Sequence, residues 1–220
     1  MFTDIIKQYS HIEKRIKESE VMLDPWPHMY ITEIFTPDFY REVQNFEQLN
    51  SLDKTLEHGR VEYIFNKYDE DYIELTTKMF KLFCDKFGYK AKADAVVPAG
   101  ATFWVDNSEL VIDDIHVDAF YDTPFTISGQ IYLPDDLSLR QYGTKLYKYN
   151  GNDLSVDARQ DPGTMHPHSA TNLDNFELVR TVPFYPNCML VTPNHITSWH
   201  CAPTVVGDDI RKSLMLRWKV

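Results

Sequence analysis

The sequence is short of cysteines, of long hydrophobic runs and of basic residues, and each shortage excludes a class of protein. Its three cysteines, Cys84, Cys188 and Cys201, are too few and too scattered for a disulfide framework or a structural zinc site. No stretch approaches the roughly 20 apolar residues that a membrane helix needs. The amino terminus carries charges throughout and has no apolar signal core. We therefore expect a cytoplasmic protein with no membrane partner.

Basic residues are outnumbered, with 22 lysines and arginines against 33 aspartates and glutamates and a formal charge of −11. This balance argues against a nonspecific grip on phosphate backbones or anionic membranes, so nucleic acid is not an expected partner. It does not exclude a local basic groove.

The apolar content is ample, at 43% of the 220 residues, and 14% are aromatic. A chain of this length and composition can bury a real core, which excludes a disordered protein. No repeat, linker or shift in composition marks a boundary, so we expect a single domain over residues 1–220. The periodicity does change, near residue 90.

Residues 1–90 are mostly of helical pattern and predict an N-terminal helical support region. Residues 3–20 have isoleucines at near-helical spacing, and Thr36-Pro37-Asp38 has the pattern of a helix start with a capping hydroxyl. Residues 71–89 predict the clearest helix, with one apolar stripe and a stop at Gly88. Residues 31–35 predict a short strand.

Residues 91–220 contain brief β-branched or aromatic segments separated by proline, glycine, asparagine and aspartate. Strands are expected within 96–106, 114–120, 125–133, 143–149, 176–182, 188–193 and 213–220. Short strands that follow a helical half predict a mainly β (α+β) fold, a jelly roll with helices packed outside it. Residues 150–175 are polar and predict a long functional or mobile loop.

His116 and Asp118 stand two apart in a strand-like segment, so their side chains share one face. An imidazole and a carboxylate that project together suit a divalent, redox-capable metal, and two histidines with one carboxylate form the facial triad of non-haem iron oxygenases. The pair alone is common by chance. Its alternative is a histidine hydrogen-bonded to a neighbour.

The closing segment supplies a candidate third ligand, His200, and a candidate anion receptor, Arg211 with Ser213. Arg211 and Ser213 share a strand face, while Leu214, Leu216 and Trp218 point the other way into a core. A buried guanidinium beside a hydroxyl binds a carboxylate well, because its planar fork meets both oxygens. Alone, this Arg-x-Ser pair also fits a surface salt bridge.

In this order, His116-x-Asp118, His200 and Arg211-x-Ser213 resemble the iron(II)/2-oxoglutarate-dependent dioxygenase superfamily, and in detail its prolyl-4-hydroxylase-like branch. Tyr132 falls where that branch has a tyrosine that contacts the far carboxylate of 2-oxoglutarate. The resemblance spans residues 28–220. It implies a double-stranded β-helix over 91–220, braced by the N-terminal helices. The sequence departs from the family at Gly143-Thr144, where the family often has a glycine pair.

The resemblance implies that His116, Asp118 and His200 hold Fe(II) and that Arg211, Ser213 and Tyr132 hold 2-oxoglutarate, the cosubstrate. With O2, and with ascorbate as a candidate reductant, a C–H bond would be hydroxylated as succinate and CO2 are released. The substrate is expected to be an amino acid, a peptide or another small molecule. The sequence does not fix the oligomeric state.

Alternatives remain for both the activity and the residues. A cupin-like metalloenzyme without 2-oxoglutarate, or a non-catalytic jelly-roll binding domain, would share this fold. His195 competes with His200 as the distal ligand, and His166 with His168 could bind metal in the polar loop. Several other residues could serve the site or only pack or be solvated: Asp113, Asp114, Tyr147, Tyr149 and Cys201.

Overall fold

The structure is a computed structural model of the chain, and it describes residues 5–48, 52–57, 59–65, 68–109, 114–118, 126–160 and 168–219. Its helices are α1 (Tyr9–Glu18), α2 (Pro37–Gln44), α3 (Glu70–Phe87) and α4 (Leu154–Asp157), with short 3-10 turns η1 (Ile5–Gln8), η2 (Phe46–Gln48), η3 (Leu137–Tyr142) and η4 (Leu173–Asn175). Its strands are β1 (Val21–Met22), β2 (His28–Thr32), β3 (Leu52–Glu57), β4 (Arg60–Phe65), β5 (Gly100–Asp106), β6 (His116–Val117), β7 (Thr126–Tyr132), β8 (Lys145–Tyr149), β9 (Ala158–Gln160), β10 (His168–Ala170), β11 (Phe176–Thr181), β12 (Cys188–Pro193), β13 (His200–Cys201) and β14 (Arg211–Lys219).

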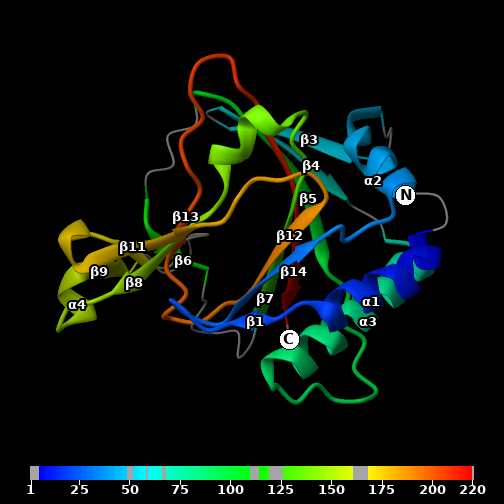
Figure 1. Cartoon of the computed structure of the whole chain (residues 1–220), viewed down its shortest axis with the longest axis horizontal. Helices are drawn as coiled ribbons and strands as arrows, with labels where there is room; N and C mark the ends of the chain where they lie inside the picture. Colours follow the sequence, from blue (N-terminus) through cyan, green and yellow to red (C-terminus); the bar gives the residue numbers. More distant parts are fainter. Residues whose placement is uncertain are drawn as a thin grey trace.

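These strands form two antiparallel sheets. The larger sheet has the order β1-β2-β12-β7-β14-β5-β4-β3, and the smaller has the order β11-β8-β13-β6-β10-β9. In Figure 1 the strands β8, β9 and β11 lie on one side of the molecule, and helices α1 and α3 lie on the other side of the large sheet. This arrangement confirms the predicted jelly-roll fold with helices packed outside it.

The large sheet has one apolar face and one polar face, and β14 shows why. Leu214, Leu216 and Trp218 point into the core beneath the helices, whereas Arg211 and Ser213 alternate with them and point to the opposite face. The polar face of the large sheet is therefore available to build a site between the sheets.

Helix α3 covers the apolar face, and it ends at Gly88 as its sequence predicts. The Asp69 carboxylate caps it by accepting from Tyr72 N at 2.8 Å, and Gly88 ends it at φ 74°, a left-handed conformation that suits glycine. Phe83 is fully buried and meets Trp218 edge to face, with ring centroids 5.4 Å apart. The stripe is therefore core packing, as predicted. No helix within the described ranges has the length and apolarity to cross a membrane.

The prediction for residues 1–90 was incomplete, because this region also contributes strands. The hairpin of β3 and β4 adds to one edge of the large sheet next to β5, and β2 pairs with β12. The helix start at Thr36 is real, but its hydroxyl donates to Gln8 Oε1 at 2.9 Å and does not cap α2. The Thr36 hydroxyl thus bonds to a residue of the preceding η1 turn instead of to the first backbone N–H groups of α2.

Residues 150–175 are more ordered than the predicted loop. Within the described residues of this segment lie α4, β9, β10 and η4. The buried carboxylate of Asp157 organises them, because it accepts hydrogen bonds from the hydroxyl of Tyr149 and the amides of Asn172 and Asn175 at 2.7 to 2.9 Å. Residues 161–167, which include His166, lie outside the described residues.

Candidate metal centre

The smaller sheet brings the two predicted histidines directly opposite each other. His116 on β6 and His200 on β13 are register partners in an antiparallel pair, and their ring centroids are 4.6 Å apart. Facing residues in such a pair project from the same side of the sheet. The strand pairing therefore joins ligands that are far apart in sequence.

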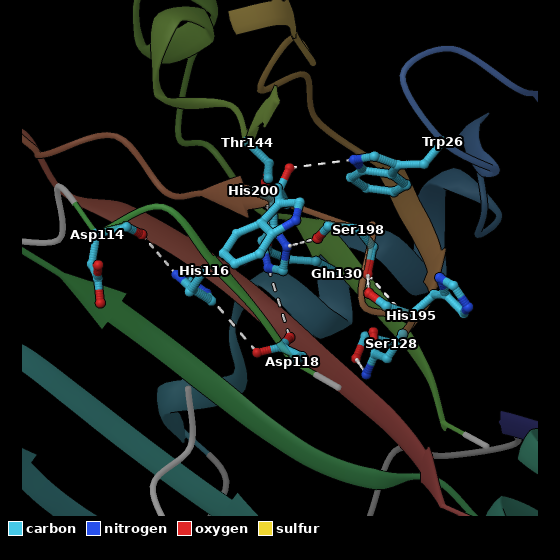
Figure 2. Close-up of polar contacts among 12 residues, drawn as sticks. Trp26, Asp114, His116, Asp118, Ser128, Gln130, Thr144, His195, Ser198 and His200 are labelled. Carbon is cyan, nitrogen blue, oxygen red and sulfur yellow. Dashed lines mark hydrogen bonds and ion pairs between the residues drawn. The ribbon is translucent and has the colours of Figure 1, made fainter. Parts of the chain in front are cut away.

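Asp118 completes the group immediately after β6. Its Oδ1 lies 3.9 Å from His116 Nε2, and its Oδ2 lies 3.7 Å from His200 Nε2 (Figure 2). One donor atom from each of the three residues lies within 4.8 Å of the others. The two imidazoles and the carboxylate thus converge on one point, in the pattern of a facial triad.

Backbone carbonyls orient both rings. His116 Nδ1 is 2.8 Å from the carbonyl oxygen of Asp114, and His200 Nδ1 is 2.8 Å from that of Ser198 (Figure 2). A carbonyl oxygen only accepts, so each Nδ1 carries a proton, and Nε2 is the ring atom that faces Asp118 and is placed to bind a metal ion. This orientation is typical of metal-ligating histidines.

The other histidine considered as a distal ligand does not join this group. His195 is exposed, and its Nδ1 lies 3.0 Å from the hydroxyl of Thr197 in its own turn. The structure therefore brings His200, and not His195, to His116 and Asp118. Asp114 serves through its carbonyl, while its carboxylate accepts from the Ser169 hydroxyl at 2.6 Å.

The three residues predicted to hold 2-oxoglutarate lie together beneath the centre, on the polar face of the large sheet. Arg211, Ser213 and Tyr132 are each 0% exposed. Arg211 donates through Nε to the carbonyl of Tyr142 and through Nη1 to Asp106, both at 2.9 Å. Its buried Nη2 finds no acceptor among the described residues. Burial of a cationic donor without an acceptor is costly, so this atom marks a place suited to an anion.

Burial also sets the state of Tyr132. It raises the pKa of the phenol above its ordinary value, although a hydrogen bond with Thr144 and the nearby charge of Arg211 oppose the rise. The phenol is therefore neutral at physiological pH and can donate a hydrogen bond.

Two residues that the sequence reasoning missed lie between this cluster and the metal centre. Gln130 donates to Ser213 Oγ at 3.1 Å, and the Thr144 hydroxyl donates to Gln130 Oε1 at 3.1 Å and lies 2.9 Å from Tyr132 OH. Gln130 and Thr144 line a cavity together with the triad, whereas the three deeper residues do not reach its wall. The signal was present for Gln130, which shares a strand face with Tyr132.

Gly143, the residue before Thr144, lies against the backbone of Val182. A Cβ atom at this position would lie 1.5 Å from the carbonyl oxygen of Val182, so only glycine allows the two backbones to approach. The single glycine of Gly143-Thr144 is thus structural, and the threonine that follows it supplies the hydroxyl.

Among the remaining candidates, Tyr147, Tyr149 and Cys201 have packing roles. Tyr147 and Tyr149 pack against a small cluster within the smaller sheet that contains Phe176 and Trp199. Cys201 is buried, with its Sγ 3.7 Å from the hydroxyl of Tyr147. His168 lies on β10, whose backbone pairs with β6 and β9. Asp113 lies outside the described residues.

Comparisons with known proteins agree on the fold. No protein-family model and no curated protein matches the sequence. Among solved structures, the chain is similar to the epimerase SnoN in complex with Fe3+, alpha-ketoglutarate and nogalamycin RO, at 12% identity over 96% of this chain and 83% of that one, with a TM-score of 0.56.

The chain is also similar in fold to two prolyl hydroxylases. A prolyl-4-hydroxylase of Pseudomonas putida is 13% identical over 94% of this chain and 97% of its own, with a TM-score of 0.53. The prolyl hydroxylase of Trichoplax adhaerens, solved with a hypoxia inducible factor peptide fragment, is 10% identical over 100% and 93%, with a TM-score of 0.51. The chain therefore has the jelly-roll fold of the iron/2-oxoglutarate oxygenases, and its histidine–aspartate–histidine group lies between the two sheets of that fold.

Proposed function

We propose that this protein is an iron(II)- and 2-oxoglutarate-dependent dioxygenase that hydroxylates a C–H bond of an amino acid, a peptide or another small molecule. The observation that carries the proposal is the convergence of His116 Nε2, His200 Nε2 and the Asp118 carboxylate, with both rings oriented by backbone carbonyls. A ferrous ion with three protein ligands on one face leaves positions open for a cosubstrate and dioxygen, and it supplies the oxidising chemistry.

The chain's own part is to bind, orient and exclude water. His116, His200 and Asp118 would hold the ion. Arg211 would pair with the far carboxylate of 2-oxoglutarate, which gives Nη2 the acceptor that the described residues do not provide. Ser213 and Tyr132 would add hydroxyls to the same carboxylate.

The hydrogen-bonded pair of Gln130 and Thr144 fixes those two hydroxyls from the side of the cavity. Because every member of this network is buried, water is excluded from the anchor, and the charge of Arg211 acts in a medium of low dielectric constant. The network thus supports the placement of the cosubstrate.

Binding of Mn2+ and the cosubstrate analogue N-oxalylglycine tests the proposal without turnover. We expect the two together to raise the melting temperature and to bind saturably by calorimetry. His200→Gln should weaken Mn2+ binding at least tenfold, because it removes one of the three ligands and the geometry that the imidazole gives to the site. His195→Gln is the matched control and should bind as the wild type does.

Activity provides the second arm. With Fe(II), ascorbate and 2-oxoglutarate, succinate should form, and mass spectrometry of candidate substrates should find a gain of one oxygen. Metal binding without any response to N-oxalylglycine would favour a cupin-like enzyme. Binding of neither would indicate a jelly-roll binding domain, and either result would refute the proposal.

A further inference from the structure

A row of three buried charged residues crosses the large sheet at the Arg211 anchor. Arg60 on β4, Asp106 on β5 and Arg211 on β14 lie on neighbouring strands, and Asp106 is the register partner of both arginines. Facing residues on adjacent strands project from the same side of a sheet. Arg60 is 8% exposed, Asp106 is 1% exposed and Arg211 is fully buried. The row is therefore an ion network largely closed off from water, and it contains two cations for one acid.

The hydrogen bonds divide the Asp106 carboxylate unequally between the two arginines. Arg60 donates through Nε to Oδ1 at 2.7 Å and through Nη2 to Oδ2 at 3.3 Å, so its planar edge spans both oxygens. Arg211 donates to this carboxylate through Nη1, to Oδ2 at 2.9 Å. Its Nε is bound to the Tyr142 carbonyl, and its Nη2 has no acceptor among the described residues. Because Arg60 holds Oδ1, Arg211 is limited to the other oxygen and its Nη2 stays available.

Aromatic rings hold both guanidinium groups in these positions. The guanidinium carbon of Arg60 lies 4.1 Å from the centroid of the Trp104 ring, and that of Arg211 lies 5.3 Å from the centroid of the Phe184 ring. Packing against a ring face restricts a planar guanidinium without occupying its N–H groups. The division of the Asp106 oxygens is therefore fixed by the surrounding core.

The charges of this row do not cancel. Two guanidinium groups and one carboxylate leave one positive charge, and that charge lies on Arg211, the arginine that has an N–H group without an acceptor in the described structure. Glu62, the other acid on this face of β4, is half-buried, so water and salt screen its charge more strongly. An uncompensated cation in a buried site is costly. A carboxylate at Arg211 Nη2 would balance the row.

We propose that Arg60 is a positioning residue for the cosubstrate, which it serves through Asp106: by holding this carboxylate, it keeps the charge and the Nη2 group of Arg211 available for the far carboxylate of 2-oxoglutarate. The inference rests on the proposed function and adds a residue to its cosubstrate site. Without Arg60, Asp106 alone would neutralise Arg211, and its free Oδ1 would compete for Nη2. The far carboxylate would then meet an ion pair without net charge.

Two probes that differ by one carboxylate isolate this effect. N-oxalylglycine carries the far carboxylate, whereas N-methyloxamate has the same metal-binding end and a hydrogen in place of that carboxylate. Both are titrated calorimetrically into protein loaded with Mn2+, and the ratio of their affinities is compared between variants. In the wild type, N-oxalylglycine should bind about tenfold or more tightly, because only it forms the charged hydrogen bonds to Arg211. Binding of N-methyloxamate shows in each variant that the metal centre is intact.

Variants of the row test the role of Arg60. Arg60→Gln should lower the affinity ratio about tenfold, because one positive charge is lost and Asp106 Oδ1 is freed. Adding Asp106→Asn removes the competing carboxylate and restores the net charge, so the double variant should recover to within about threefold of the wild type. Arg60→Lys should keep most of the ratio, because the charge remains. Arg41→Gln, at an exposed arginine on α2, is the matched control and should leave the ratio unchanged.

The outcomes separate this inference from the proposed function. An unchanged ratio in Arg60→Gln would overturn the role of Arg60, and so would an equal loss in the single and double variants, which would point to cavity shape instead of charge. If Arg60→Gln does not fold, the double variant decides, because a tenfold lower ratio at the wild-type net charge contradicts the inference. Equal affinities of the two probes for the wild type would refute Arg211 as the anchor and the role of Arg60 with it.

The wild type distinguishes the two levels of failure. If N-oxalylglycine does not bind to the wild type loaded with Mn2+, the proposed function is refuted and the inference falls with it. If N-oxalylglycine binds more tightly than N-methyloxamate but the ratio does not respond to Arg60→Gln, only the inference is refuted.

Discussion

At the scale of single residues, the site depends on a few buried polar atoms, and the Thr144 hydroxyl contacts two of them. Its hydroxyl lies between Tyr132 OH and Gln130 Oε1, at 2.9 and 3.1 Å, and the residue is 3% exposed. Few other side chains could satisfy both neighbours in so little space. This hydroxyl therefore couples the cavity wall to the deeper anchor, alongside the hydrogen bond from Gln130 to Ser213 Oγ.

Thr144→Val should lower the free energy of unfolding by about 1 to 3 kcal/mol, because valine keeps the shape but removes the donor to Gln130 Oε1 and leaves Tyr132 OH with only the longer bond from Thr144 N. Chemical denaturation at pH 7.5 measures this loss. Thr181→Val, at an exposed position on β11, is the matched control and should change stability by no more than about 0.5 kcal/mol. An equal effect of the two substitutions would show that the hydrogen bonds of the Thr144 hydroxyl do not stabilise the fold.

His28 should give the protein a pH-dependent stability. Its side chain is fully buried on β2, its Nδ1 lies 2.8 Å from the carbonyl oxygen of Trp26, and burial lowers its pKa from the ordinary value of 6.5. The unfolded chain therefore takes up a proton more readily than the folded one. The stabilisation that the neutral His28 ring gives to the folded state is complete above pH 6.5. It is lost as the pH falls from there toward the lower pKa of the folded state.

His28→Asn keeps a donor for the Trp26 carbonyl and removes the titrating ring. Between pH 7.5 and 5.5 the wild type should lose more unfolding free energy than this variant, as measured by denaturation at each pH. His195→Asn, at an exposed histidine, should follow the wild-type curve. Parallel curves for wild type and His28→Asn would contradict the assignment.

At the scale of elements, the position of the large sheet depends on helix α3, which covers its apolar face. Phe83 is 0% exposed and meets Trp218 of β14, whose indole Nε1 donates to the Thr76 carbonyl at 2.9 Å. The same strand carries Arg211 and Ser213 on its other face. The docking of α3 therefore supports the anchor from behind.

Phe83→Ala should cost about 3 to 5 kcal/mol of unfolding free energy, because it removes a large buried ring and leaves a cavity. Leu56→Ala truncates a side chain that is 75% exposed on β3 and serves as the control, with an expected change within about 0.5 kcal/mol. Urea denaturation compares the two variants. A loss below about 1 kcal/mol for Phe83→Ala would mean that the helix contributes little to the fold.

The strands of the second half were predictable because alternation and turn residues are local signals. The hairpin of β3 and β4 was missed because it follows two helical segments and carries charges on both strands, so its pairing with β5 becomes evident only in three dimensions. The short strand β13 was likewise invisible, since two residues carry no period. His200 was still identified, from its spacing to Arg211 and Ser213.

One side of the cavity at the metal centre shows what spacing along the sequence cannot reveal. Arg60, Trp104 and Arg217 come from three strands that are neighbours only in the folded sheet. Nothing in their separate segments marks them as a group. The metal ligands, in contrast, lie within short segments whose order along the chain is itself a signal.

At the scale of the whole molecule, all three thiols are enclosed by the fold. Cys84, Cys188 and Cys201 form no disulfide bond and are at most 4% exposed, and burial raises the pKa of Cys84 to about 11. A buried thiol with a raised pKa reacts slowly, because the thiolate is the reactive form.

Ellman's reagent should therefore label no cysteine in the native protein within minutes at pH 8 and all three in 6 M guanidinium chloride. The denatured sample, at the same concentration of Ellman's reagent, is the control that shows all three thiols can react. Rapid labelling of one thiol in the native state would mean that the fold opens locally at that site.

The pairing of His116 with His200 has a consequence for how the molecule assembles. These partners are separated by 84 positions and lie on strands of two residues each, so few backbone hydrogen bonds hold them in register. A slip by a single position would turn one imidazole to the far side of the sheet. An ion held by both rings and by Asp118 would link segments that are distant in the sequence, and it would stabilise only the correct register. Loading with metal should thus be a late event that locks a jelly roll already formed.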